Sequence, residues 1–427
     1  MKILIKNNLS SNEFKKLLVR PAINFEESIK ISKAILDDVK INGLQAVLSY
    51  AEKFDGIQDN NIIVSESEIN NSVRIDKKVK EAIDTAYENI KKFHEAISFE
   101  NYELNTMVGV KCRLEYRPIN NVGIYIPGGT AVLPSTMLML GVPAQIAGVK
   151  RIVACTPAKN GKVNDPVLYA AYKCGVKEIY KVGGAQAVAL MAYGVEGINK
   201  VDKIFGPGNQ YVTAAKMLVS NDPNGCSIDM PAGPSEVLIV ADEKANPSFV
   251  AADLLSQAEH GADSLAVLVS TSVDTLEKTI KELYTQLEFL PRRKYALESI
   301  SKSFALKVNT LEEAFEFSNN FAPEHLIIHA NKAERFIKEV KNAGSVFVGE
   351  YSPESAGDYA SGTNHSLPTY GFAKSIGGVS VMSFMKTITF QQLTEKGLVN
   401  LSNAIINLAE EEGLAAHANA VKIRLKK

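Results

Sequence analysis

Short β-rich runs alternate with amphipathic helical segments from about residue 120 onward, and this alternation constrains the fold more than any other feature. Strands that alternate with helices form βαβ units, and such units build parallel sheets. The pattern falls into two series, which predicts an α/β protein with two Rossmann-like lobes. The first series of predicted strands covers 123–126, 151–154, 178–182 and 203–205. The second series covers 237–241, 265–269, 305–308, 326–329 and 345–348, with helices near 247–260, 275–288, 311–320 and 332–341.

The regions outside this alternation are predicted to be mostly helix or loop. Residues 1–115 are expected to be helical, because apolar residues recur within them at helical spacing, and Asp76 is an expected N-cap. Residues 350–380 are rich in Gly, Ser, Tyr and Pro without periodicity, and a loop of that length in a compact protein is usually functional. Helix is expected again from about 390, followed by a short β-like run over 421–425.

The overall charge and the apolar segments exclude several classes of partner. A formal net charge of −1 provides no field to attract nucleic acid or an anionic membrane. The most apolar stretch, 119–149, is interrupted by prolines and glycines, which fits a strand and a buried helix better than a membrane span. None of the four cysteines stands in CxxC spacing, and residues 1–16 lack the apolar core of a signal peptide. We therefore expect a cytoplasmic protein with reduced thiols.

Glycine-rich turns in the region of the predicted strands indicate a site for a nucleotide-sized ligand. Glycine lets backbone N–H groups approach a ligand closely, and ligands of α/β sheets bind at the carboxyl ends of strands. Each turn could instead be purely structural, and the GxGxxG fingerprint of dinucleotide sites is absent. The turns are IPGGT at 126–130, VGGAQA at 182–187, FGPGN at 205–209 and PAGPSE at 231–236, of which the last three carry the polar residues Gln186, Asn209 and Ser235.

The spacing of Gln257 and His260 indicates a possible metal site. Residues three apart on a predicted helix share a face, so this pair can supply two converging ligands to zinc. Asp358 in the long loop and His417 in the tail are further candidates, and the four residues form a mixed nitrogen and oxygen set compatible with zinc. Gln is an unusual zinc ligand, and a Gln-x-x-His pattern by itself commonly arises by chance. His94, on a predicted helix near lysines, is expected to be solvated.

Glu324 and His325 are adjacent in the segment FAPEHL, at the start of a predicted strand. Neighbouring strand residues point to opposite faces, but at the mouth of a strand both can border one pocket. An imidazole that titrates near neutral pH and a carboxylate that accepts protons from water could divide acid–base work. A surface dipeptide without a catalytic role is the alternative interpretation.

Several segments occur in a fixed order along the chain: GIYIPGG, VGGAQAVALMAYG, FGPGNQYVTAAK, DMPAGPSE, LLSQAEHG, NNFAPEHL, AGDYASGTNHSLPT and EEEGLAAH. Together they resemble the histidinol dehydrogenase family, and the resemblance runs from about residue 25 to 424. It implies a role for each candidate residue. The implied zinc ligands are Gln257, His260, Asp358 and His417, and the implied acid–base pair is Glu324 and His325. The implied NAD contacts are Tyr125, Gln186 and Asn209. The implied substrate contacts are Ser235, His325, His365 and Glu412, together with the zinc ligands.

The resemblance also implies an activity and an assembly. The activity is the oxidation of L-histidinol through L-histidinal to L-histidine with Zn²⁺ and two NAD, as the last step of histidine biosynthesis. The assembly is a homodimer with shared active sites, in which the C-terminal tail crosses to the other subunit. The implied fold has two incomplete Rossmann-like domains and small terminal extensions. Its expected divisions are 1–25, then 26–120 with 236–380 for the metal and acid–base residues, 121–235 for NAD, and 381–427 for the tail.

Three other functions remain open at the level of sequence. A related zinc and NAD dehydrogenase could act on another small polar alcohol. A thiol-dependent aldehyde dehydrogenase could use Cys112 or Cys155 as its nucleophile, although neither stands in a convincing motif. A zinc-stabilised dimeric binding protein without enzymatic activity is the third possibility.

Overall fold

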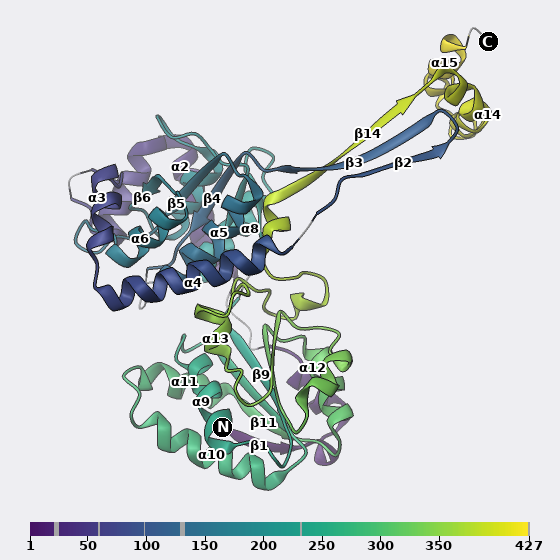
Figure 1. Cartoon of the computed structure of the whole chain (residues 1–427). Helices are drawn as coiled ribbons and strands as arrows, with labels where there is room; N and C mark the ends of the chain where they lie inside the picture. Colours follow the sequence, from purple (N-terminus) through teal and green to yellow (C-terminus); the bar gives the residue numbers. More distant parts are fainter. Residues whose placement is uncertain (21–24, 59, 98, 129–132, 231–232, 426–427) are drawn as a thin grey trace.

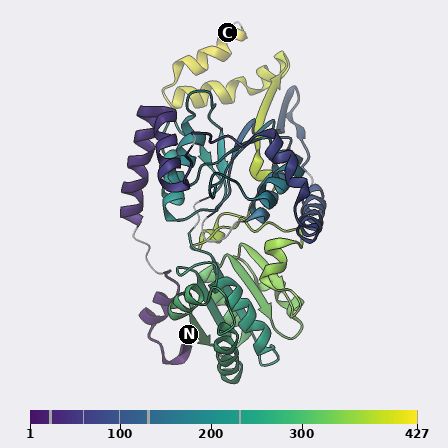
Figure 2. The ribbon, with the colours of Figure 1, turned by 90° about the vertical axis from the view of Figure 1, so that its left-hand side faces the viewer.

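The computed structural model describes residues 1–427 except 21–24, 59, 98, 129–132, 231–232 and 426–427. Two α/β lobes lie one above the other, and a long thin arm projects from the upper lobe (Figure 1). A view turned by 90° shows the same two lobes from the side (Figure 2). Each lobe is built around a parallel sheet with helices on its faces, which confirms the predicted fold class.

The upper lobe contains a five-stranded parallel sheet in the order β6-β5-β4-β7-β8. Its strands are β4 (Asn121–Tyr125), β5 (Arg151–Cys155), β6 (Glu178–Tyr180), β7 (Lys203–Phe205) and β8 (Ser227–Ile228). The helices of this lobe are α2 (Phe25–Tyr50), α3 (Glu66–Asn71), α4 (Lys77–Glu95), α5 (Pro134–Ala147), α6 (Asp165–Lys173), α7 (Gly184–Tyr193) and α8 (Gln210–Ser220).

Helices α2 and α4 belong to the upper lobe by their packing. Ile35 of α2 lies in one buried cluster with Tyr125 of β4. Ile90 of α4 lies in a second buried cluster with Leu138 of α5. The sequence-based grouping of 26–120 with the metal-bearing lobe is therefore wrong for these helices, because their apolar faces are buried against the other sheet.

The lower lobe contains a six-stranded parallel sheet in the order β1-β11-β10-β9-β12-β13. Its two central strands β9 and β10 are buried along their whole length, as expected for strands covered on both faces. The strands are β1 (Lys2–Ile5), β9 (Glu236–Ala241), β10 (Leu265–Ser270), β11 (Phe304–Lys307), β12 (His325–His329) and β13 (Ser345–Val348). The helices are α1 (Ser11–Leu17), α9 (Pro247–Ala258), α10 (Val273–Leu287), α11 (Arg293–Lys302), α12 (Leu311–Phe321) and α13 (Glu354–Tyr359).

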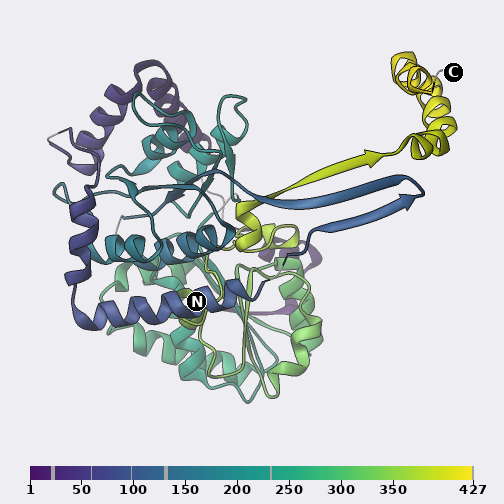
Figure 3. The ribbon, with the colours of Figure 1, turned by 45° about the horizontal axis from the view of Figure 1, so that its top comes forward.

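The arm is a three-stranded antiparallel sheet that carries two helices at its tip (Figure 3). The hairpin of β2 (Tyr102–Met107) and β3 (Val110–Pro118) pairs with β14 (Met385–Leu393), which brings distant parts of the sequence side by side. Helices α14 (Glu395–Glu411) and α15 (Ala415–Arg424) follow β14.

Several local predictions are corrected by these elements. Residues 102–118 form a hairpin rather than helix, with Gly109 at a φ of 84° in its turn, a conformation that glycine adopts readily. The first residues form the edge strand β1 rather than helix, and 421–425 continue α15 rather than forming a strand. The segment predicted as helix at 332–341 is the 3₁₀ helix Ala333–Glu339. The remaining short helical turns are Lys6–Asn8, Ala51–Asp55, Ser72–Arg74, Phe372–Lys374 and Val381–Phe384.

Among the described residues, no helix is both long and apolar enough to cross a membrane.

His94 is buried, with a relative exposure of 1%, which corrects the expectation that it is solvated. It lies four residues after the fully buried Ile90 on α4, so it continues the apolar face of the helix. Neither ring nitrogen has a hydrogen-bond partner among the described residues. Burial lowers the pKa of His94 to about 4.

We expect His94→Leu to stabilise the protein, and the gain to grow as the pH falls. The unfolded chain binds a proton at His94 near pH 6.5 while the folded protein resists it down to about 4, so the wild type loses stability between these values. At pH 5 the lowered pKa of His94 costs the wild type about 2 kcal/mol in free energy of unfolding. Urea unfolding of both proteins at pH 5 and pH 8 measures it. A gain of equal size at both pH values would contradict the neutral buried state of His94.

Candidate active site

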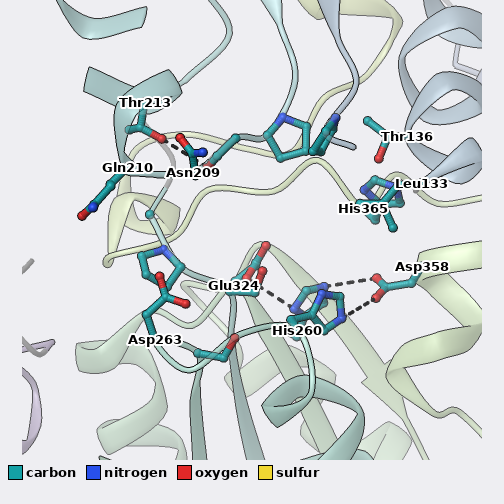
Figure 4. Close-up of a pocket in the computed structure, with 18 of the residues that line it drawn as sticks. Leu133, Thr136, Asn209, Gln210, Thr213, His260, Asp263, Glu324, Asp358 and His365 are labelled. Carbon is teal, nitrogen blue, oxygen red and sulfur yellow. Dashed lines mark hydrogen bonds and ion pairs between the residues drawn. The ribbon is translucent and has the colours of Figure 1, made fainter. Parts of the chain in front are cut away.

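A cavity of ≈ 320 Å³ lies between the two lobes and is lined by residues from both. The upper lobe contributes residues that follow the carboxyl ends of its strands, such as Pro207 and Asn209 after β7. The lower lobe contributes residues just before the amino ends of its strands, such as Ser235 before β9 and Ser264 before β10. Figure 4 shows Asn209 and Glu324 on opposite sides of this space. The carboxyl-end position expected for the glycine-rich turns thus holds for the turn after β7, whereas the turn before β9 lies at an amino end.

Glu324 and His325 border the cavity together, as the sequence analysis expected. Glu324 directly precedes β12 and His325 is the first residue of that strand. Both are buried, with exposures of 6% and 4%. The Glu324 carboxylate accepts a hydrogen bond of 2.8 Å from the backbone N–H of Glu236. The His325 ring places Nδ1 3.7 Å from Glu324 Oε2 and 3.3 Å from the Glu236 carbonyl oxygen.

Burial and neighbouring charges shift the pKa values of both groups. Burial raises the pKa of Glu324 to about 8, although the His325 ring and the Glu236 N–H act in the opposite direction. Burial alone would lower the pKa of His325, but the carboxylates of Glu354, Glu324 and Asp358 outweigh it and raise that pKa to about 10. Of the two groups, Glu324 therefore has the pKa closer to neutral pH.

A group of possible metal ligands lies beside this pair. One ligand atom from each of His260, Glu354 and Asp358 lies within 4.8 Å of the others. Asp358 Oδ2 is 4.0 Å from His260 Nε2, and Asp358 Oδ1 is 3.5 Å from His325 Nε2. His260 is not on α9 as expected, because that helix ends at Ala258 and His260 follows two residues later. It nevertheless faces Asp358 (Figure 4).

The orphaned side-chain atoms show that these residues fit a metal ion. Gln257, in the last turn of α9, is fully buried, and neither its amide nitrogen nor its amide oxygen has a hydrogen-bond partner in the described structure. Both carboxylate oxygens of the buried Glu354 lack such a partner as well. Buried polar atoms without partners are costly, and a cation would satisfy the oxygens. Imidazole and carboxylate donors are ones that zinc accepts, and the Gln257 amide is the unusual member of the set.

Glu354 is the residue that the sequence analysis missed. It begins α13 and stands four residues before Asp358, so the two carboxylates share one face of this short helix. Asp253 of α9 accepts a hydrogen bond from the Glu354 backbone N–H, and this contact connects the helix of Gln257 to the helix of Asp358. The spacing of Glu354 and Asp358 in a segment rich in Gly and Ser was the available signal.

The three expected NAD contacts lie at different depths. Asn209 lines the cavity, and its side-chain oxygen caps α8 by accepting from the N–H groups of Tyr211 and Val212. Tyr125 and Gln186 are buried and do not line the cavity. The Tyr125 hydroxyl accepts a hydrogen bond of 3.1 Å from the Gly184 N–H, so it supports the glycine turn. The expected turns IPGGT and PAGPSE lie partly outside the described residues.

The expected substrate contacts fall into two groups. Ser235 and His365 line the cavity with His325. Glu412 and His417 belong to the tip of the arm, where both are exposed, and neither lines the cavity of its own chain. Of the expected zinc ligands, His260 and Asp358 therefore lie together in one chain, and Gln257 is buried three residues before His260. His417 lies apart from them, at the tip of the arm.

Comparisons with known proteins agree on one family. The sequence profile of histidinol dehydrogenase matches residues 18–425. The chain is 51% identical to the histidinol dehydrogenase of Campylobacter jejuni (strain RM1221), over 100% of this chain and 99% of that one. It is also 51% identical to the chloroplastic histidinol dehydrogenase of Arabidopsis thaliana, over 100% of this chain and 92% of the relative.

The chain belongs to the histidinol dehydrogenase family.

The crystal structure of histidinol dehydrogenase from Elizabethkingia anophelis superposes with a TM-score of 0.95 at 48% sequence identity, covering 100% of this chain and 98% of that one. The resemblance found in the sequence is thus confirmed. Membership in the histidinol dehydrogenase family makes the protein an oxidoreductase and connects it with histidine biosynthesis.

We expect His260→Asn to weaken zinc binding by more than about 10-fold. Loss of a residue that only hydrogen-bonds to a metal ligand already costs about 10-fold in affinity, and loss of the ligand itself should cost more. The fold should persist, since the cores of both lobes are built from apolar clusters away from this residue. Calorimetric titration of metal-free protein with zinc measures the affinity. His329→Asn is the matched control, because His329 is buried at the far end of β12 and does not line the cavity. Equal zinc affinities in the two variants would exclude His260 as a ligand.

Proposed function

We propose that the protein is a zinc-dependent histidinol dehydrogenase that oxidises L-histidinol through L-histidinal to L-histidine with two NAD, as the last step of histidine biosynthesis. The observation that carries this proposal is the buried Glu324–His325 pair, which shares one cavity with the metal-ligand group and with the loops of the upper lobe. The names of the relatives support histidinol as the substrate.

The described residues suggest how the two absent groups would be held. Zinc would bind Gln257, His260 and Asp358, with His417 of the partner subunit as a fourth ligand, and the unpaired Gln257 amide supports this assignment. NAD would lie along the upper lobe near Asn209, with Tyr125 and Gln186 shaping the turn behind it. When bound, zinc would orient the imidazole and amine of the substrate, and NAD would accept the hydrides.

His325 would act as the base in the oxidation of the alcohol. Its Nε2 faces Asp358 and the cavity, so it can take the hydroxyl proton as the hydride leaves the carbon. Asp358 and Glu354 keep its pKa high, and neutralising their charges moves the imidazole towards the neutral form that a base requires. Ser235 and His365 line the same cavity and would contact the substrate. Glu412 of the partner subunit would pair with a cationic group of the substrate.

Glu324 would activate water in the oxidation of the aldehyde. The carboxylate takes one proton from water as the oxygen adds to the aldehyde carbon, and the hydrated aldehyde then loses the second hydride. A pKa near 8 suits this role, because a general base works best when its pKa is close to the ambient pH. The bound aldehyde would not need to leave the cavity between the two steps.

The appearance of NADH absorbance with histidinol and NAD tests the proposed function directly. We expect about two NADH per histidinol, because oxidation of an alcohol to a carboxylate releases four electrons and each NAD accepts two. We also expect little activity on a panel of other small amino alcohols. Oxidation of the panel at the histidinol rate would favour the related dehydrogenase of broader specificity. No NADH with any alcohol would favour the binding protein.

Variants of the pair separate the two steps in the same assay. His325→Asn should slow histidinol oxidation by about 10²–10⁴-fold, the range for loss of a general base. Glu324→Gln should impair histidinal oxidation more than histidinol oxidation. In the wild type, histidinal oxidation should rise with pH and level off above about 8, because the carboxylate must be ionised. Equal losses on both substrates for Glu324→Gln would contradict separate roles.

We also propose that the protein is a homodimer in which the arm crosses to the partner. Glu412 and His417 lie at the tip of the arm, which projects away from the two lobes (Figure 3). The arm exposes large apolar side chains. Exposed apolar surface on so thin an element is typical of an interface. A two-fold dimer would let each cavity receive the other chain's tip. The exposed apolar residues of the arm include Tyr102, Leu104, Val108, Leu408 and Ile423.

Mixing two inactive variants tests whether His417 acts across the dimer. Glu324→Gln and His417→Ala homodimers should each be nearly inactive. After random subunit exchange about half of the dimers are mixed, and one of their two sites is intact, so activity should return to about a quarter of wild type. If His417 serves its own chain, every site keeps one lesion and no activity returns. Mass spectrometry of isotope-labelled subunits confirms the exchange.

The thiol-dependent alternative is not supported by the positions of the cysteines. Cys155 is fully buried at the end of β5, and burial raises its pKa well above the range of a reactive thiolate. Cys112 lies on β3 of the arm, and neither residue lines the cavity. All four cysteines are unpaired, which supports the expected cytoplasmic location.

A further inference from the structure

A buried ion pair lies directly behind the acid–base pair. Arg20, which follows α1, donates from Nε to Glu236 Oε2 at 2.8 Å and from a terminal nitrogen to Glu236 Oε1 at 2.7 Å. The side chains are 7% and 2% exposed. Two parallel hydrogen bonds between a guanidinium and a carboxylate fix the geometry of both groups, not only their distance. Neither residue lines the cavity.

The backbone of Glu236 holds both members of the acid–base pair. Its N–H donates to Glu324 Oε2 at 2.8 Å, and its carbonyl oxygen lies 3.3 Å from His325 Nδ1. A carbonyl can only accept, so this contact favours the tautomer with the proton on Nδ1. When the ring gives up its other proton, the basic lone pair is on Nε2, which faces Asp358 and the cavity.

Arg20 also contacts the turn that leads into Glu324. Its guanidinium donates to the Ala322 carbonyl oxygen at 3.3 Å and lies 3.6 Å from the centre of the Phe321 ring. Ala322 has a φ of 53°, so this turn is held in a left-handed conformation that a residue with a side chain rarely adopts. Arg20 thus joins the start of β9 to the start of β12, the two segments that carry the pair and its backbone partner.

We propose that Arg20 is a positioning residue for the reaction: through Glu236 and the Ala322 turn, it fixes the peptide groups that orient Glu324 and His325. The inference rests on the proposed function, because it takes the roles of these two residues from there. Arg20 touches no reacting atom. Its removal should therefore slow the chemical steps without weakening the binding of substrate or NAD.

Two variants test this role by steady-state kinetics on the full-length enzyme with zinc. Arg20→Lys keeps the charge but loses the paired hydrogen bonds. The double variant Arg20→Met/Glu236→Met removes the ion pair without leaving a buried charge alone, a change that proteins commonly tolerate. We expect the double variant to lower kcat about 10–100-fold for both histidinol and histidinal, since small misplacements of reacting groups cost this much. KM should stay within about threefold, and Arg20→Lys should be intermediate.

Arg151→Met/Glu178→Met is the matched control. Arg151 and Glu178 form the same doubly hydrogen-bonded pair, at 2.8 Å and 2.7 Å, at the amino ends of β5 and β6 in the upper lobe. Neither residue lines the cavity or contacts the acid–base pair. This variant should keep kcat within about twofold of wild type, because an ion pair that does not contact Glu324 or His325 contributes only to stability. Thermal unfolding of all variants shows whether they are folded at the assay temperature.

A combination with His325→Asn separates positioning from general damage. If Arg20 acts through the pair, adding Arg20→Lys to His325→Asn should slow histidinol oxidation less than about twofold further, because the group being positioned is already gone. Additive losses would overturn the proposal, and so would a folded double variant with normal kcat or with only a raised KM. If the double variant does not fold, Arg20→Lys alone decides. A wild type that fails to oxidise histidinol refutes the proposed function instead, independently of any Arg20 variant.

Discussion

The parallel pairing of β9 with β12 determines where the chemistry of this protein can take place. The register sets Val237 opposite His325, so Glu236 and Glu324 become neighbours at the same edge of the sheet. Strands covered on both faces leave this edge poorly solvated, and burial there raises the pKa of Glu324. A shift of one residue in this register would turn His325 away from the cavity and leave the Glu236 peptide without its partners.

The two lobes meet with opposite ends of their strands. Carboxyl ends in the upper lobe supply glycine-containing loops and the helix cap at Asn209, whereas amino ends in the lower lobe supply the proposed acid–base side chains. The division gathers the carboxyl groups of Glu324, Glu354 and Asp358 in the lower lobe, where burial and their mutual repulsion raise the pKa of Glu354. The distance from Asn209 to the Glu324–His325 pair therefore depends on how the two lobes are placed relative to each other. Packing between the lobes must fix that placement.

The sequence was sufficient for the features that depend on local pattern. Period-two and continuous apolar runs identify β9, β10 and β12, and the adjacency of Glu324 and His325 is visible without a structure. The packing partner of α2 and α4 was not predictable, because periodicity reveals an apolar face but not the sheet that covers it. The hairpin of the arm was missed because every residue of β2 is exposed and gives no burial signal.

Other parts of the site depend on contacts between residues that are far apart in the chain. Arg20 and Glu236 are separated by 216 positions, and nothing in either segment alone indicates the other. His94 stands among lysines and a glutamate, as a surface residue commonly does. Only its place on the buried face of α4 shows that it is buried. Glu354 gains its importance from Asp358 on its own helix and from Asp253, which meets it through the contact of α9 with α13.

The edge strand β1 has a consequence for how the protein is made. Lys2 pairs with Phe304, and the amino group of Met1 donates to the Tyr284 hydroxyl at 2.6 Å. The first strand therefore has no sheet to join until about 300 further residues have been synthesised, which takes about 15–60 s at typical ribosomal rates of roughly 5–20 residues per second. During that time the opening segment, including Arg20, waits without its partners while the upper lobe already has its sheet. Strand β1 and Arg20 are thus among the last parts of the lower lobe to reach their places, although they precede its other strands in the chain.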